Sequence, residues 1–228
     1  MLSHIELKNI KQSFQVNGTK ISLFDRLELS IAQGQSYAIT GPSGAGKSSL
    51  LMLMSGLEKP TTGQCHYILN NQIKSLDALK SDIGFIFQQF HLLPELTAIN
   101  NVALPLKLRG DKQATIKAKR WLDKVGLSHR INHKPSELSG GEQQRVAIAR
   151  ALVFEPHFIF ADEPTGNLDQ QSADEVANIL FSCCQENNAG LVIVTHSEAL
   201  ARRANHVFSL VGGQLQQISQ AKPQVISC

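Results

Sequence analysis

The first third of the chain alternates polar and apolar residues, which is the two-residue period of strands with one buried face. The alternation runs over residues 3–10 and returns over residues 23–31, with the hairpin signal Asn17-Gly18 between them. A further short strand is expected at residues 65–69, followed by a turn at Asn70-Asn71. These segments predict an antiparallel β unit near the N-terminus.

Later segments are short and mostly apolar, as expected for strands buried on both faces of a parallel sheet. They cover residues 35–40, 83–87, 158–161 and 191–195. Helical spacing of apolar residues appears over residues 48–54 and 171–184. The chain closes with a predicted hairpin, 207–219, and a short tail, 221–228.

Between residues 94 and 151 the strand signals disappear and the apolar residues take helical spacing. They include Ile99, Val102, Ala103 and Leu106, then Ala114, Ala118, Trp121, Leu122 and Val125. We therefore predict a single domain over residues 1–228, with an α-helical subdomain at 89–155 inserted into an α/β core. Residues 1–88 and 156–228 would form that core, which contains a mainly parallel sheet and the antiparallel β subdomain.

Composition changes this picture little, because the charge is nearly balanced. The 228 residues include 22 Lys and Arg against 19 Asp and Glu, and the formal charge of +3 gives no reason to expect nucleic-acid binding. No apolar run reaches the roughly 18 residues of a membrane span, and no signal peptide is visible, so we do not expect the chain to cross a bilayer itself. The cysteines lack metal-ligand spacing and are expected to be free thiols; they are Cys65, Cys183, Cys184 and Cys228.

A glycine-rich segment joins the strand expected at 35–40 to the helix expected at 48–54. It reads Gly41-Pro42-Ser43-Gly44-Ala45-Gly46-Lys47-Ser48, the G-x-x-x-x-G-K-S pattern of a phosphate-binding loop, and Ser49 continues it into the helix. The glycines let backbone N–H groups turn inward, and the helix start adds free N–H groups of its own. Lys47 supplies charge for the β- and γ-phosphates, and the hydroxyl of Ser48 suits Mg²⁺. The pattern predicts a nucleotide site on a P-loop NTPase core.

Two carboxylates, Asp162 and Glu163, follow the buried strand at 158–161. Buried strands rarely end on paired acids unless a cation or a reaction uses them. Asp162 suits an indirect hold on Mg²⁺, through a ligand of the ion or through a bound water. Glu163 is then available to orient and deprotonate an attacking water. The structural alternative is a capping pair at a turn.

Further polar residues are expected at the same edge of the sheet as the loop. Gln88 and His196 each follow a buried strand, and ligands in open α/β sheets bind outside the carboxyl ends of the strands. Either could instead be an ordinary surface or structural residue. Ser139 fits a helix N-cap, and Gly140-Gly141 leaves that helix start open to an anion. Phe14 is either a core aromatic or a platform for a ligand ring, and its spacing alone favours the core.

With these residues in place, the chain resembles the ATPase subunits of ABC transporters over nearly its whole length. In family order, the matches are residues 41–48 with Walker A, Gln88 with the Q-loop, 138–144 with the LSGGQ-type signature, 158–162 and Glu163 with Walker B, Asn167-Leu168-Asp169 with the D-loop, and His196 with the H-loop. Any one match could be chance, but six in the family's order are difficult to explain otherwise.

The resemblance implies a dimer in which two copies sandwich two ATP molecules, with Mg²⁺, head to tail. Lys47 and Ser48 of one copy would hold a nucleotide whose γ-phosphate meets Ser139-Gly140-Gly141 of the other. Glu163 would be the general base, and His196 would be a γ-phosphate partner.

The remaining roles also come from the resemblance. Gln88 would belong to the catalytic residues and to the Mg²⁺ site and would couple that site to the helical subdomain, and Asp169 would reach across the dimer. Phe14 stands where the family stacks an aromatic ring on adenine, more often a tyrosine, which reverses the preference for the core. Residues 88–108 would form the groove that receives the permease.

Residues 85–88, 92–98, 101–106 and 161–169 resemble one subgroup more narrowly, which contains the lipoprotein-releasing, macrolide-efflux and cell-division ABC ATPases. Membership would imply an integral membrane permease as partner and a peripheral place on the cytoplasmic face of the inner membrane. The stretch between Gly63 and Gly84 is shorter than the subgroup pattern. An importer ATPase is one alternative. A soluble, non-transport ABC ATPase is another, although tandem cassettes and long coiled-coil insertions are lacking.

Overall fold

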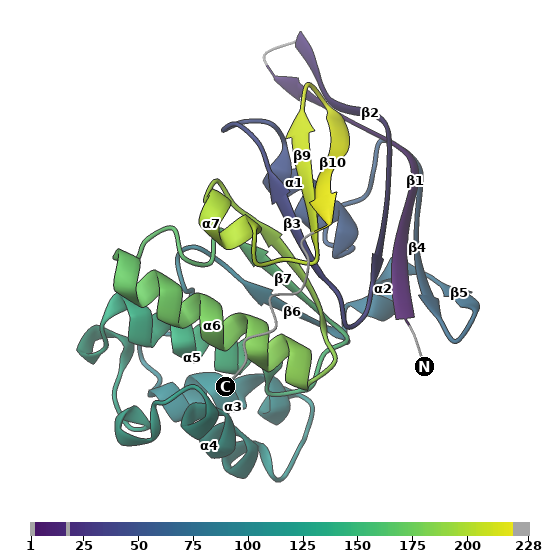
Figure 1. Ribbon diagram of the computed structural model, residues 1–228. Coiled ribbons are helices and arrows are strands. Elements are labelled where there is room, and N and C mark those ends of the chain that lie inside the picture. The colour runs from purple at the N-terminus through teal and green to yellow at the C-terminus, as the bar shows by residue number, and fades with distance from the viewer. Residues whose placement is uncertain (1–2, 17–18, 221–228) are drawn as a thin grey trace.

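The computed structural model describes residues 3–16 and 19–220, and Figure 1 shows their arrangement. The hairpin turn predicted at Asn17-Gly18 and the tail predicted at 221–228 lie outside the described residues. An antiparallel sheet stands on one side of a larger core sheet, and most of the helices gather on the other side (Figure 1).

The N-terminal strands form an antiparallel sheet in the order β2-β1-β4-β5. Its strands are β1 (Ser3–Val16), β2 (Thr19–Ala32), β4 (Thr62–Leu69) and β5 (Gln72–Lys74). β1 and β2 are longer than the alternation predicts, because register shifts after Leu7, Ile10 and Gln12 interrupt the two-residue period without ending the pairing. The predicted turn at Asn70-Asn71 is confirmed, with both residues at positive φ.

The core sheet has the strand order β10-β9-β3-β8-β7-β6 and is parallel except for the edge strand β10. Its strands are β3 (Ser36–Thr40), β6 (Ile83–Ile86), β7 (Phe158–Asp162), β8 (Gly190–Val194), β9 (His206–Val211) and β10 (Gln214–Gln220). β9 and β10 form the predicted C-terminal hairpin. The expectation of a mainly parallel sheet is therefore confirmed.

Alternate residues of β7 join two different hydrophobic clusters, because successive side chains of a strand point to opposite faces. Phe158 and Phe160 pack with α1 (Lys47–Met54) and with the antiparallel sheet. Ile159 and Ala161 pack with the helices of the opposite face. The core sheet is therefore covered on both faces, which explains why its central strands are apolar throughout.

Helices fill the sequence between β6 and β7, where the helical spacing predicted them. They are α3 (Ala98–Leu108), α4 (Ala114–Lys124), α5 (Gly140–Leu152) and the 3₁₀ turns Ser128–Arg130 and Pro135–Glu137. Elsewhere, the short helix α2 (Leu76–Leu79) precedes β6, the long helix α6 (Gln170–Glu186) follows β7, and the short helix α7 (Glu198–Ala201) follows β8. Across residues 3–16 and 19–220, no helix has both the length and the hydrophobicity to span a bilayer.

The parallel strands bring four of the predicted motifs to one edge of the core sheet. β3 leads into the phosphate loop, β6 into Gln88, and β8 into His196, while β7 ends on Asp162. Parallel neighbours place their carboxyl ends at the same edge, which is where ligands bind in open α/β sheets. The topology thus converts motifs that are far apart in sequence into a single site.

Candidate functional site

The phosphate loop, residues 41–48, leaves β3 and runs directly into α1. Gly41, Gly44 and Gly46 have φ angles of 153°, 79° and 91°, a backbone region that glycine tolerates far better than other residues. A Cβ on Gly41 would lie 2.4 Å from a carbonyl oxygen of β9, so the loop could not pass this strand with a larger residue. The ammonium of Lys47 donates to two carbonyl oxygens of the loop, at 2.9 and 3.1 Å. The side chain of Lys47 therefore lies across the phosphate loop.

The carboxyl group of Asp162 lies beside the first turn of α1. Burial raises its pKa, a hydrogen bond with the hydroxyl of Ser48 lowers it, the charge of Glu163 raises it, and the charge of Lys47 lowers it. The net effect places the pKa above the ordinary value of a carboxyl group. Asp162 and Glu163 are two neighbouring, partly buried acids, and the ammonium of Lys47 balances only one negative charge. The remaining negative charge favours the approach of a further cation.

The oxygen donors at this point suit Mg²⁺, a hard cation that takes one or two protein oxygens together with phosphate oxygens and water. Ser48 and Asp162 supply such oxygens side by side. In the part of the chain that the structure describes, no group of three His, Cys, Asp or Glu residues could hold a metal. One hydroxyl and one carboxylate are the kind of donor set that Mg²⁺ uses together with phosphate oxygens and water.

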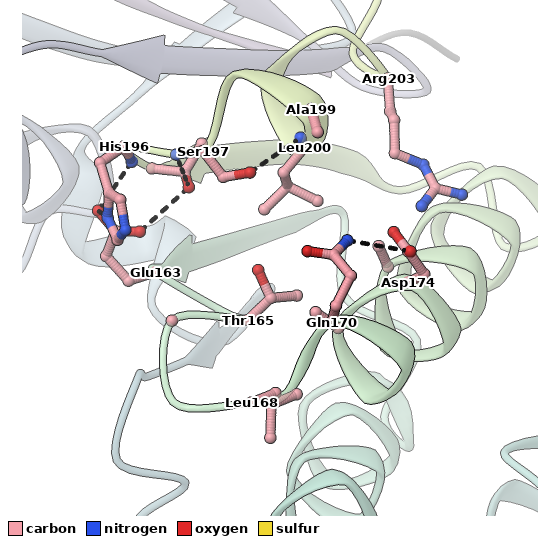
Figure 2. A pocket seen from close by; sticks show the side chains of 14 residues that line it. Glu163, Thr165, Leu168, Gln170, Asp174, His196, Ser197, Ala199, Leu200 and Arg203 are labelled. Carbon is pink, nitrogen blue, oxygen red and sulfur yellow. Dashed lines mark hydrogen bonds and ion pairs between the residues drawn. The ribbon is translucent and has the colours of Figure 1, made fainter.

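Glu163 is held against the end of β8 by three donors (Figure 2). Its Oε1 accepts from the backbone N–H of His196 at 3.0 Å and lies 2.9 Å from Nδ1 of the same residue. Its Oε2 accepts from the hydroxyl of Thr195 at 3.0 Å. The φ of Glu163 is 46°, which is uncommon for a residue other than glycine and is often found at functional sites. The predicted base and the predicted γ-phosphate partner thus form one unit.

A pocket opens beside this unit, between the segment after β7, the start of α6, and α7. Figure 2 shows Glu163 and His196 at one end of the pocket and Asp174 and Arg203 at the other. The sequence did not indicate this pocket, because its lining comes from two stretches that are separate in sequence, 163–177 and 195–203.

Gln88 binds the segment that follows Glu163. Its Nε2 donates to Oδ1 of Asn167 at 3.0 Å, and Nδ2 of Asn167 donates to the carbonyl oxygen of Gln88 at 3.0 Å. A Cβ on Gly166 would lie 3.0 Å from the Gln88 amide nitrogen, so the two segments are in close contact. The sequence placed Asn167 in a motif but gave it no role, since a reciprocal amide pair becomes visible only in the fold.

Ser139 caps α5, as predicted. Its hydroxyl accepts from the N–H of Glu142 at 3.2 Å, and the carboxylate of Glu142 accepts from the N–H of Ser139 at 2.8 Å. The next two residues pack closely: a Cβ on Gly140 would lie 3.3 Å from Leu168, and one on Gly141 would lie 3.2 Å from Ser172. Within the described residues, this helix start therefore contacts the segment after β7 and α6, and not the phosphate loop.

Two further side chains of α5 connect it to the loops that carry the other motifs. Gln144 is fully buried and donates to the carbonyl oxygen of Pro164 at 2.6 Å. Arg150 donates to the carbonyl oxygens of Phe90 and His91, at 2.9 and 2.6 Å. The sequence did not predict these contacts, because their acceptors are backbone carbonyls and leave no trace in the residue pattern.

Asp169 and Phe14 occupy more exposed positions. Asp169 is the N-cap of α6, and its carboxylate accepts from the N–H of Ser172 at 3.0 Å, a bond that lowers the pKa of this carboxyl group. Phe14 lies on β1 with 39% of its surface exposed, so the core position favoured by its spacing alone is wrong. Its ring is open to a ligand.

Comparison with known proteins identifies the family. The sequence profile of the family described as ABC transporter matches residues 24–166, well over half of the chain. The chain belongs to the ABC transporter family. Three relatives carry the name lipoprotein-releasing system ATP-binding protein LolD. The Coxiella burnetii protein is 43% identical to this chain, over 95% of this chain and 96% of its own length. The Geobacter metallireducens protein is 43% identical, over 94% of this chain and 99% of its own length. The Rickettsia bellii protein is 44% identical, over 92% of this chain and 96% of its own length.

The solved structures that are similar to this chain are also ATP-binding cassettes. A dimeric ATP-binding cassette, MJ0796, in a post-hydrolysis state with ADP and phosphate, is 35% identical. It superposes with a TM-score of 0.83 over 96% of this chain and 99% of that one. A second dimeric structure of the same protein, described as a bacterial ABC transporter cassette, gives the same values. The predicted fold class, a P-loop NTPase core with an antiparallel β subdomain and an inserted helical subdomain, is confirmed, and the chain is an ABC ATPase that binds and hydrolyses ATP.

Proposed function

We propose that this ABC ATPase is the energy-supplying subunit of a lipoprotein-releasing transporter. Two copies would bind ATP between them and act on an integral membrane permease from the cytoplasmic face of the inner membrane. The observation that best supports the proposal is the 43% identity, over 95% of the chain, to the LolD of Coxiella burnetii. We expect no nucleic-acid partner.

Nucleotide binding would begin at the phosphate loop. The backbone N–H groups of residues 41–49 and the start of α1 offer donors to the phosphates, and Lys47 adds a positive charge for the β- and γ-phosphates. Mg²⁺, held by Ser48 and Asp162, would neutralise phosphate charge. The exposed ring of Phe14 offers a face on which adenine could stack.

Hydrolysis would proceed by in-line attack of water on the γ-phosphorus, with the protein acting through positioning and charge. Glu163 would accept the proton of that water, since its carboxylate follows the same strand as Asp162. His196 would contact the γ-phosphate, because its ring is 70% exposed beside Glu163 and can reach a ligand at this edge.

The second half of each nucleotide site would come from the second copy. Ser139 is exposed at the capped start of α5, and Gly140-Gly141 leaves backbone N–H groups of that helix start free for an anion. Asp169 is exposed nearby at the start of α6 and would meet the partner copy. The dimeric cassettes among the solved relatives support this arrangement.

Communication with the permease would pass through Gln88. Its amide pair with Asn167 joins the end of β6 to the segment that carries Glu163 and Asp169. A displacement of Gln88 by the permease would therefore reach the catalytic segment through two hydrogen bonds. The groove of residues 88–108 is the proposed contact.

Co-purification tests the transporter assignment most directly. The chain, tagged at one end, is expressed in its native cells, extracted from membranes in mild detergent, and its partners are identified by mass spectrometry. We expect an integral membrane permease with few spans and a large periplasmic domain. Recovery of an importer permease, or of ribosomes in place of a membrane protein, would overturn the proposal and leave the ATPase itself intact.

A further inference from the structure

Thr195 is a buried polar residue that the predicted site did not include. It follows β8 and is only 1% exposed. The N–H of Ser197 donates to its Oγ1 at 3.0 Å, and this Oγ1 donates to Oε2 of Glu163 at 3.0 Å. The N–H of Thr195 donates to the carbonyl oxygen of Ile39 at 3.1 Å, which fixes its backbone to β3. Side chain and backbone are therefore both anchored.

The bond from Ser197 decides where the hydroxyl proton of Thr195 points. A hydroxyl has one proton and two acceptor lone pairs. One lone pair is used by the N–H of Ser197, and an ionised carboxylate can only accept, so the proton goes to Glu163. One carboxylate oxygen of Glu163 thus has a donor of fixed position and direction.

The other side chain that binds Glu163 has more freedom to move. The ring of His196 is 70% exposed, whereas the side chain of Glu163 is 15% exposed. If the ring turns to the γ-phosphate, its Nδ1 leaves Oε1, while the backbone N–H of His196 and the hydroxyl of Thr195 stay in place. Among the described residues, Thr195 is then the one side chain still bonded to the carboxylate.

We propose that Thr195 is a positioning residue that keeps the Glu163 carboxylate aimed at the attacking water, which rests on the proposed role of Glu163 as base. Catalysis by a base depends on its placement within hydrogen-bond reach of the proton it accepts. Thr195 does not touch the nucleotide in this scheme. Loss of its hydroxyl should therefore slow hydrolysis and leave ATP binding unchanged.

The test uses three substitutions with matched shapes. Thr195→Val removes the hydroxyl and keeps the branched side chain, and Thr195→Ser keeps the hydroxyl and removes the methyl group. Thr40→Val is the matched control: Thr40 ends the neighbouring strand β3, and its hydroxyl donates to the carbonyl oxygen of Phe208 at 3.1 Å, not to a carboxylate. Each variant is made in the wild type and with Glu163→Gln.

Steady-state ATP hydrolysis is measured for the full chain, alone and with the membrane proteins that co-purify with it. For Thr195→Val we expect kcat to fall roughly 10- to 100-fold with KM for ATP changed by less than about twofold. Thr195→Ser and Thr40→Val should keep kcat within about threefold of the wild type. In the Glu163→Gln background, measured as single turnovers, Thr195→Val should add no further loss.

Several results would overturn the inference. The inference fails if Thr195→Val is as active as the wild type, or if Thr195→Ser loses as much activity as Thr195→Val. It also fails if Thr195→Val slows the Glu163→Gln protein as much as it slows the wild type. Each result would show that the hydroxyl does not act through Glu163. If Thr195→Val melts below the assay temperature, Thr195→Ala removes the same hydroxyl with less bulk and replaces it in the comparison. Multiple turnover by Glu163→Gln itself would instead refute the proposed base, whatever Thr195 does.

Discussion

Gly84 lies on β6 in close contact with the end of α5. A Cβ at this position would lie 2.3 Å from the carbonyl oxygen of Ala151, near the end of α5, and 2.6 Å from Cδ1 of Ile159 on β7. Both distances are far shorter than ordinary contacts, and the oxygen belongs to backbone that cannot rotate away. We therefore expect Gly84→Ala to push the end of α5 off the sheet.

Overpacking of this kind costs about 1–3 kcal/mol of folding free energy, and each kcal/mol lowers Tm by roughly 2–4 °C in a chain of this length. A decrease of about 2–12 °C in Tm is thus expected, measured by differential scanning calorimetry with far-ultraviolet circular dichroism as a second probe. ATP hydrolysis well below Tm should also fall, because the opposite end of α5 carries Ser139 and Gln88 follows β6 directly.

A second substitution separates the two clashes. Valine has no Cδ1, so Ile159→Val removes one of the two close atoms and leaves the Ala151 oxygen in place. The double variant should be more stable than the sum of the two single losses predicts. A Gly84→Ala protein that melts within about 1 °C of the wild type would refute the close approach of α5 to β6. Strict additivity in the double variant would refute the clash with Ile159.

Three predictions concern the nucleotide site. Glu163→Gln should keep ATP affinity and lower multiple-turnover phosphate release by about 10²- to 10⁴-fold, and wild-type turnover would contradict its role as base. Lys47→Ala removes a charge-assisted contact and should weaken ATP binding by roughly 10- to 100-fold in a titration, and unchanged affinity would contradict the assigned contact. Ser139→Arg should abolish the ATP-dependent dimer of the Glu163→Gln protein on size-exclusion chromatography and spare binding by single subunits. Ser139→Ala removes the same hydroxyl, and with it the cap of α5, without adding bulk, and is the control; a dimer that persists in Ser139→Arg would contradict the head-to-tail contact.

The elements of the core could be predicted because each follows a local rule. β7 and β8 are short apolar runs, as strands covered on both faces must be. The phosphate loop has a residue pattern that is specific to phosphate-binding loops between a strand and a helix. β1 was predicted too short, since its alternation breaks at Ile10 while its pairing continues past the register shifts. Local periodicity cannot distinguish a bulge from the end of a strand.

The network around Glu163 could not be predicted in the same way. Thr195 and Asn167 act through partners 32 and 79 residues away in sequence, and nothing in their neighbouring residues indicates these bonds. Arg150 binds two backbone carbonyl oxygens, a kind of acceptor that every residue offers. Such contacts follow from the tertiary fold, and the sequence could indicate only the motifs that they connect.

Among the residues that the structure describes, the start of α5 contacts Leu168 and Ser172 and not the phosphate loop of its own chain, so in the proposed dimer a subunit would contribute to two nucleotide sites without completing either. In a head-to-tail pair, damage to α5 disables the nucleotide bound by the neighbour, and damage to the loop disables the subunit's own. A mixed dimer of a Lys47 variant and an inactive Ser139 variant that still dimerises would then concentrate both defects in one site and leave the other whole. Two inactive proteins of this kind should complement each other when mixed.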